Sequence, residues 1–247
     1  MRKEGHAKLI IGILILLVVV QAVDDFDYKS FLIDTVSFEQ RDFSSQTLFL
    51  PAVDQEGRGV LATLLVEADF GTGKELINID KLVFWEDTQQ SIQTAKQVAC
   101  EYTGVGEDSI DVIYSISSDG ATVVGGPSAG AALTVATIAA IEGRELDNSV
   151  IITGTINSDQ TIGPVGGILE KALAAQENGA RLFLIPQGEG LHTYIEPQRT
   201  CREMGSLTYC ETVYKTVSIS IGDELDIEVR EVANIQDALK YFQKNEA

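Results

Sequence analysis

Residues 119–186 constrain the fold of this chain most, because alanine-rich segments and short apolar segments succeed each other within them. The first alanine-rich segment predicts a helix over residues 129–142, ended by Gly143. The second predicts a helix over residues 168–178, ended by Gly179. Alanine has the highest helix propensity, and a glycine directly after a helix is a common C-cap. Three apolar segments are predicted to be strands: residues 149–155, 161–165 and 181–185. Helices between strands without regular β-α-β alternation predict an α+β domain.

Ser128 lies in the sequence GGPSAG, at the start of the first predicted helix. Free backbone N–H groups and the positive end of the helix dipole lie at a helix N-terminus. Such groups can stabilise an oxyanion beside a nucleophilic hydroxyl, here in a loop formed by Gly126, Pro127 and Ala129. A serine at this position is most often only an N-cap. Taken alone, Ser128 therefore leaves both roles open.

Lys171 lies on the second predicted helix among alanine, leucine and isoleucine side chains. Burial disfavours a charged amine, so such surroundings lower the pKa of a lysine and allow its neutral amine to act as a base. The alternative is a solvated lysine beside Glu170, with only its aliphatic stem against apolar surface. For a lone lysine, that alternative is the commoner one.

The two helices and the strands between them resemble the proteolytic domain of Lon proteases, which use a serine–lysine dyad. The shared motifs are G-P-S-A-G, a Thr-Gly pair at a strand end, a G-G-x-x-x-K helix and an apolar strand that ends in Ile-Pro. Carried over by position, the resemblance implies that Ser128 is the nucleophile, Lys171 the base and Thr153 the hydroxyl that supports the lysine. It covers roughly residues 61–186 and returns in LDIEVREVANIQDALKYF near the end.

The same resemblance implies a fold, a substrate and an assembly. The fold is α+β, with mixed sheets, packed helices and a β-α-β-β-α-β core. The substrate is an unfolded or flexible polypeptide, which in the family lies along the strand before the nucleophile loop, here residues 111–117. The assembly is a homo-oligomeric ring. With 247 residues the chain is too short to hold the ATPase module of a full Lon protease as well. In this respect it resembles stand-alone Lon-like proteases of the archaeal type, which lack the ATPase module.

Two positions depart from the family pattern. Gly125 stands where members commonly carry an acidic residue three positions before the nucleophile, a role that Asp119 could fill. Thr155 stands where many members carry glutamate after the Thr-Gly pair. These departures leave an alternative open, in which the chain is a catalytically silent Lon-like module that binds peptides.

Several ligand classes are disfavoured. The net charge of −19 opposes nucleic-acid binding, which needs clustered lysine and arginine. Nucleotide binding is not expected, because no G-x-x-x-x-G-K-[ST] motif occurs. Residues 71–74 instead predict the turn of a hairpin between strands 59–70 and 76–79, followed by a helix over 87–103. No cofactor is expected, and no metal, since the chain has two histidines and no C-x-x-C pair.

Residues 1–22 have the pattern of a targeting segment, with a basic start, an apolar run and a small-residue cleavage site. They are predicted to be a cleaved signal peptide or, alternatively, a retained anchor that holds the chain to the membrane through residues 9–23. In either case residues 23–247 form the Lon-like domain and lie outside the cytoplasm.

Residues 187–222 are longer than the family connection and are predicted to be an insertion. Cys201 and Cys210 lie within it, and export favours a disulfide between them over two free thiols. Cys100 is expected to be a buried apolar residue. His192 also lies in the insertion, and no spacing connects it to Ser128 as the base of a Ser-His-Asp triad.

Overall fold

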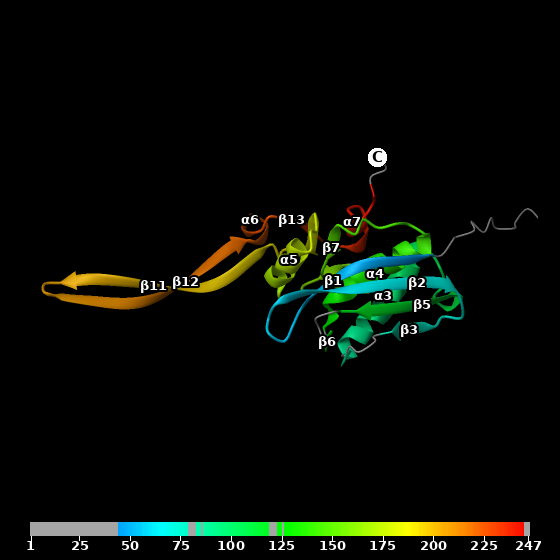
Figure 1. The fold of residues 1–247 in the computed structure, drawn as a ribbon, viewed down its shortest axis with the longest axis horizontal. Coiled ribbons are helices and arrows are strands. Elements are labelled where there is room, and N and C mark those ends of the chain that lie inside the picture. The colour runs from blue at the N-terminus through cyan, green and yellow to red at the C-terminus, as the bar shows by residue number, and fades with distance from the viewer. Residues whose placement is uncertain (1–43, 79–82, 85, 119–122, 125, 245–247) are drawn as a thin grey trace, which may run out of the picture. The chain divides into compact units, whose positions relative to one another are not determined.

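The computed structural model describes residues 44–78, 83–84, 86–118, 123–124 and 126–244 (Figure 1). The predicted targeting segment, residues 1–22, lies outside this range. The described part contains several sheets with packed helices, so the predicted α+β class is confirmed. None of the helices in the described ranges is long and apolar enough to cross a membrane.

The larger sheet has four strands in the order β1-β2-β5-β3. Its strands show the alternation of buried and more exposed residues that is typical of a sheet with one covered face. Helix α4 packs against β1 and β2, and α3 packs against α4. The elements are β1 (Ser45–Val53), β2 (Gly59–Phe70), β3 (Glu75–Asn78), α3 (Glu86–Thr103), β5 (Ile110–Ser117) and α4 (Gly130–Glu142).

The predicted hairpin between residues 59–70 and 76–79 is wrong. β5 lies between β2 and β3, antiparallel to β2 and parallel to β3. The Asp111 carboxylate of β5 accepts the backbone N–H groups of Thr72 and Lys74, each at 2.7 Å, and so joins the turn to β5 rather than to β2. With neighbours on both sides over residues 112–115, β5 also has no open edge there for a substrate strand.

Helix α4 forms the centre of the main core. All of its residues except Glu142 are buried, and Gly143 ends it in the left-handed conformation with φ 65°. Its alanines allow close approach of the sheet and of α3. Its two threonines, Thr134 and Thr137, donate to backbone carbonyls one turn earlier at 2.8 and 2.7 Å, so their hydroxyls are buried without loss of hydrogen bonds.

A second, parallel sheet has the order β13-β10-β7, and helix α5 packs on β10. Ile151, Phe183, Ile185 and Ala172 are among the side chains that form a separate buried cluster between this sheet and α5. Two short pairs, β4 parallel to β6 and β8 antiparallel to β9, form two-stranded sheets of their own outside the two larger sheets. The elements are β4 (Val83–Phe84), β6 (Val123–Val124), β7 (Val150–Ile152), β8 (Thr155–Ile156), β9 (Ile162–Gly163), α5 (Ile168–Glu177), β10 (Leu182–Pro186), β13 (Glu228–Val232) and α7 (Ile235–Leu239).

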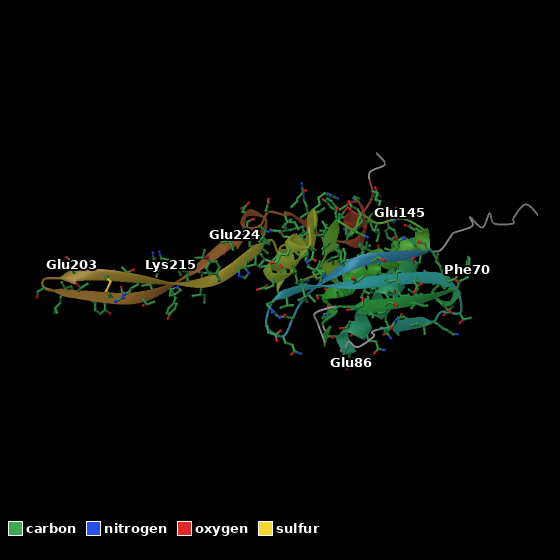
Figure 2. All side chains as sticks on the ribbon, viewed as in Figure 1. Phe70, Glu86, Glu145, Glu203, Lys215 and Glu224 are labelled. Atoms are coloured by element: carbon green, nitrogen blue, oxygen red, sulfur yellow. A yellow bond between two sulfur atoms is a disulfide. The ribbon has the colours of Figure 1, made fainter. Side chains whose placement is uncertain are left out.

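The predicted insertion, residues 187–222, contains a long β-hairpin of β11 (Leu191–Met204) and β12 (Leu207–Ser220), followed by α6 (Ile221–Glu224). The two strands pair along their whole length and form a two-stranded sheet of their own. Cys201 lies directly opposite Cys210, and their sulfur atoms form a disulfide (Figure 2). Gly205, with φ 67°, occupies the first central position of the tight turn.

Candidate active site

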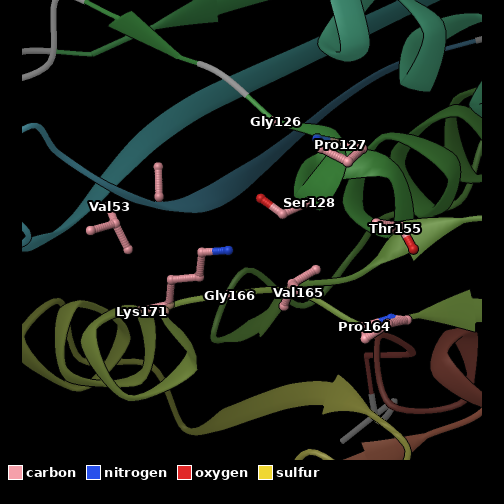
Figure 3. Close-up of a pocket in the computed structure, with 11 residues that line it drawn as sticks. Val53, Gly126, Pro127, Ser128, Thr155, Pro164, Val165, Gly166 and Lys171 are labelled. Atoms are coloured by element: carbon pink, nitrogen blue, oxygen red, sulfur yellow. The ribbon is translucent and has the colours of Figure 1, made fainter.

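A cavity of about 430 Å³ lies between the end of β1, the loop before α4 and the start of α5, and both Ser128 and Lys171 line it (Figure 3). Its walls come from the end of β1, the loop before α4, the start of β8 and the segment before α5. The Ser128 hydroxyl and the Lys171 amine extend toward the same open space in this cavity. Residues that are 43 positions apart in the sequence are thus brought to one site.

Ser128 belongs to a single 3₁₀ turn, η2 (Pro127–Ala129), that leads into α4. The turn starts at Gly126, whose φ of 92° is strained for any residue with a Cβ atom. Two side chains of helix α3 hold this turn by hydrogen bonds. Asp87 accepts the N–H of Gly126 at 3.3 Å, and the Ser91 hydroxyl donates to the carbonyl of Pro127 at 3.3 Å. The Ser128 side chain caps neither η2 nor α4, so the N-cap role is not the one that the structure shows.

Lys171 lies in the first turns of α5 and is only 3 % exposed. Its amine donates to the Thr153 hydroxyl at 3.4 Å. No carboxylate forms an ion pair with it within the ranges that the structure describes. Burial lowers the pKa of Lys171 from 10.5 to about 8, against a smaller opposite effect of the Glu170 charge. Part of this amine is therefore neutral near pH 8, as a proton acceptor must be.

Thr153 connects the lysine to the nucleophile loop. It is fully buried, and its hydroxyl donates to the backbone carbonyl of Ser128 at 3.4 Å while it accepts from Lys171. Its own N–H donates to the carbonyl of Leu184 in β10 at 3.0 Å, and the next residue, Gly154, donates to the Ser128 carbonyl at 3.0 Å. The Thr-Gly pair therefore fixes Ser128 against the second sheet.

Lys96 shows that burial of a lysine is not by itself a functional mark. It is 4 % exposed, on α3, and its amine donates to the carbonyl of Gly73 at 2.8 Å. It therefore stabilises the 71–74 turn, and it does not line the cavity. Lys171 differs because its amine reaches an open space that it shares with a serine.

Several residues of the site were not found from the sequence. Ala52 and Val53, at the end of β1, form one wall of the cavity, and Asp87 fixes the loop. No local motif marks these three, because they reach the site through tertiary packing. The segment from Pro164 to Gly167 also lines the cavity, and its two glycines before a helix could have indicated it.

Thr155, one of the two departures from the family pattern, lines the cavity beside Pro164 (Figure 3). The other, Gly125, and its suggested substitute Asp119 lie outside the described residues. Cys201, Cys210 and His192 do not line this cavity. Of the loop residues named from the sequence, Gly126 gives its N–H to Asp87, and Pro127 has no N–H to give.

Comparison with known proteins gives a consistent result. The family described as Lon protease (S16) C-terminal proteolytic domain matches residues 62–221. Among relatives, the chain is 28 % identical over 176 residues to the Lon protease of Desulfatibacillum aliphaticivorans, which is 65 % of this chain and 21 % of the relative. It is 48 % identical over 85 residues to Lon protease 2 of Syntrophobacter fumaroxidans, which is 34 % of this chain and 11 % of the relative.

The Lon protease of Escherichia coli K12 is 36 % identical over 106 residues, which is 41 % of this chain and 14 % of that protein. The chain thus spans about a fifth or less of the length of these relatives. The matched family model is that of the proteolytic domain.

Proposed function

Because this chain belongs to the family of Lon protease (S16) C-terminal proteolytic domains, we propose that it is a serine endopeptidase with a Ser128–Lys171 dyad. The observation that carries the proposal is the buried Lys171 amine, with its pKa lowered to about 8, in one cavity with the Ser128 hydroxyl. The substrate is an unfolded or flexible polypeptide.

In the proposed reaction the Ser128 Oγ attacks the carbonyl carbon of the scissile bond, and the neutral Lys171 amine takes the hydroxyl proton. Backbone N–H groups around Ser128, at the positive end of α4, stabilise the oxyanion. Lys171 then gives the proton to the leaving amine as the C–N bond breaks. Water, deprotonated by the same lysine, next attacks the acyl carbon. The ester C–O bond to Ser128 breaks, and Lys171 returns its proton to the Ser128 Oγ as the second product leaves.

Thr153 positions the base in this scheme. Its hydroxyl donates to a carbonyl and can therefore only accept from Lys171. One N–H of the amine is directed to Thr153, which leaves the nitrogen lone pair for the serine proton. Thr153 does not touch the substrate carbonyl in this proposal and is a positioning residue.

The test is hydrolysis of casein and of a peptide library by the purified domain without nucleotide. A serine-reactive phosphonate should label Ser128. Ser128→Ala should lose hydrolysis and labelling, and its fold should persist because the hydroxyl caps no helix. Wild-type turnover in Ser128→Ala would disprove the nucleophile assignment. A folded wild type that neither cleaves nor labels would instead favour a silent peptide-binding module, the alternative that Thr155 in the cavity suggests.

Three further parts of the proposal concern the setting. The protease acts without ATP, outside the cytoplasm, and as a homo-oligomeric ring, either released from its leader or anchored by residues 9–23. The composition of the leader and the Cys201–Cys210 disulfide support export. Fractionation of the producing cells tests the location. Light scattering of the purified protein tests the assembly, and a monomer at micromolar concentration would contradict a ring.

A further inference from the structure

A second cavity, of about 220 Å³, adjoins the one that holds Ser128 and Lys171. Val165 and Gly167 line both cavities, so only this short segment separates them. Another wall of the second cavity is the base of the hairpin, including Glu189, His192 and Thr193. The insertion, which the sequence analysis kept apart from the chemistry, therefore contributes to the surroundings of the candidate active site.

The base of the hairpin is held firmly. The carboxylate of Glu231, on β13, accepts the backbone N–H groups of Gly188 and Gly190 at 2.9 and 3.0 Å. The N–H of Ile221, after the second strand, donates to the carbonyl of Gly190 at 3.0 Å and connects the two ends of the hairpin. The imidazole of His192 stacks on the ring of Tyr194. The backbone that carries the lining residues Glu189, His192 and Thr193 is therefore fixed at the base of the hairpin before any ligand arrives, which lowers the entropic cost of binding.

The charge of this cavity is negative. Glu189 is the one side chain with a full charge in its lining, and within the described residues no cation pairs with it. The nearby carboxylate of Glu231 is bonded to backbone groups only, and the whole chain has a net charge of −19. The hydroxyl of Thr193 and the imidazole of His192 add polar atoms. A cation is the complementary ligand for this set of groups.

The size of the second cavity limits which cationic ligand it can hold. Pockets for small molecules usually enclose about 300–1,000 Å³, so this one is small for a ligand of that kind. It suits a single side chain. A polypeptide bound at Ser128 is already adjacent, because the two cavities share Val165 and Gly167.

We propose that the second cavity is a specificity subsite that takes a lysine or arginine side chain of the bound polypeptide, with Glu189 as its counter-ion. This inference rests on the proposed function, since the polypeptide is the substrate of the Ser128 site. The basic residue lies a few positions from the scissile bond.

Paired fluorogenic peptides test the proposal, with lysine or norleucine at each of four positions on both sides of the cleaved bond. At one position the wild type should prefer lysine in kcat/KM by about fivefold, the upper end for a partly exposed charge pair. Glu189→Gln should lose this preference, so that its kcat/KM values on the lysine and norleucine peptides become equal. Glu203→Gln is the matched control, because Glu203 is an exposed glutamate at the far end of the same hairpin (Figure 2) and should keep the preference.

The result that overturns the proposal is a wild type without a basic preference at any position, or a preference that persists in Glu189→Gln. If the wild type cleaves no peptide at all, the proposed function fails and the subsite is still measured by binding. Fluorescence anisotropy with Ser128→Ala should then give tighter binding of the lysine peptide than of the norleucine peptide, and a difference that shrinks at high salt. Equal affinities would disprove the subsite independently of the protease.

Discussion

The region around α4 and the β11–β12 hairpin differ most in the burial of their apolar side chains. In α4 all residues but Glu142 are buried, and most of them are alanine, isoleucine, leucine or valine. In the hairpin no residue of either strand is buried, although tyrosine, isoleucine, valine and leucine are frequent. Helix α4 is stabilised by packing against α3 and against β1 and β2. The hairpin is stabilised by the backbone hydrogen bonds between its two strands and by one disulfide.

This contrast shows what burial does for chemistry. Burial lowers the pKa of Lys171 to about 8, whereas Lys215 of the hairpin is exposed to solvent. The hairpin strands also hold three acidic and three basic residues, in a chain whose net charge is −19. The groups with altered chemistry therefore lie in the packed region, which is the region around α4 and α5, and the hairpin presents side chains that are exposed to solvent. The following predictions test this division.

The largest difference should come from two identical substitutions, Lys171→Met and Lys215→Met. Loss of a general base costs about 10²–10⁴-fold in rate, so Lys171→Met should lower kcat/KM by about 10³-fold. Lys215 is exposed on β12, so the same change there should have no measurable effect. Thermal denaturation of both variants verifies that they fold. If Lys171→Met kept wild-type turnover, another group would have to take the serine proton.

The pH dependence of kcat/KM should follow the titration of Lys171. Its neutral form is the active one, so activity should rise about tenfold per pH unit below the pKa of about 8 and level off above it. A mechanism with a histidine base would instead give a rise near about pH 6.5 and a plateau by neutral pH. The profile is measured for wild type and for His192→Ala, which should coincide. An inactive His192→Ala variant would require the dyad to be abandoned.

The same lowered pKa has a consequence for stability. The unfolded chain binds a proton at this lysine up to about pH 10.5, and the folded chain only up to about pH 8. Between these values the unfolded state binds more protons, so the contribution of Lys171 to the free energy of unfolding becomes more favourable as pH rises. Lys171→Met should remove this part of the pH dependence in urea titrations.

Two isoleucines compare packing in the two regions. Ile138 of α4 is fully buried, and Ile195 of β11 is 68 % exposed. Ile138→Ala should lower the free energy of unfolding by about 2–5 kcal/mol, because the lost contacts leave a cavity in the core. Ile195→Ala should change it by less than about 0.5 kcal/mol. Similar losses in both variants, measured by urea denaturation, would mean that the hairpin is packed against something in solution.

The predictability of the fold also differs between the two regions. The end of α4 followed from its alanine run and from Gly143, since helix propensity and capping act over a few residues. Helix α5 ends at Glu177 with Asn178 as its C-cap, one residue before the predicted end and the predicted cap Gly179. The partner of β3 did not follow, because the insertion of β5 between it and β2 is decided by long-range packing and by Asp111. The hairpin was recognised only as an insertion. The frequent threonine, tyrosine and valine residues on both sides of Gly205 are typical of strands, and they mark this segment as a hairpin.

For the site, the resemblance to Lon proteolytic domains, carried over by position, predicted which residues meet, and Ser128, Thr153 and Lys171 do lie together. The sequence could also indicate the direction of the Lys171 pKa shift, because the neighbouring residues on its helix are apolar. It could not indicate the wall at Ala52 and Val53 or the second cavity at the hairpin base. Those features depend on where separate elements meet in space.

The cysteines of the hairpin and of the packed region should differ in their reactivity, and reduction of the disulfide should have a small effect on activity. Reduction of the Cys201–Cys210 disulfide should change peptide hydrolysis by less than about twofold, as expected for a change away from the site. Iodoacetamide should then modify Cys201 and Cys210 in the folded protein. Cys100 should stay unmodified until unfolding, because burial raises the pKa of its thiol to about 11. Mass spectrometry of digests gives the order of labelling, and free Cys201 and Cys210 before reduction would contradict the disulfide.

Addition of nucleotide should have the smallest effect of all, namely no change in the rate of hydrolysis. The one Gly-x-Gly-Lys turn, at residues 71–74, belongs to the packed region, and its geometry opposes phosphate binding. The N–H groups of Thr72 and Lys74 already donate to the Asp111 carboxylate, which would also repel a phosphate at the same place. Peptide hydrolysis by the purified chain should therefore be equal with and without millimolar ATP and Mg²⁺. Casein hydrolysis, which involves a longer polypeptide, should be equally indifferent. A reproducible stimulation of either reaction that Asp111→Asn altered would assign a nucleotide site to this turn after all.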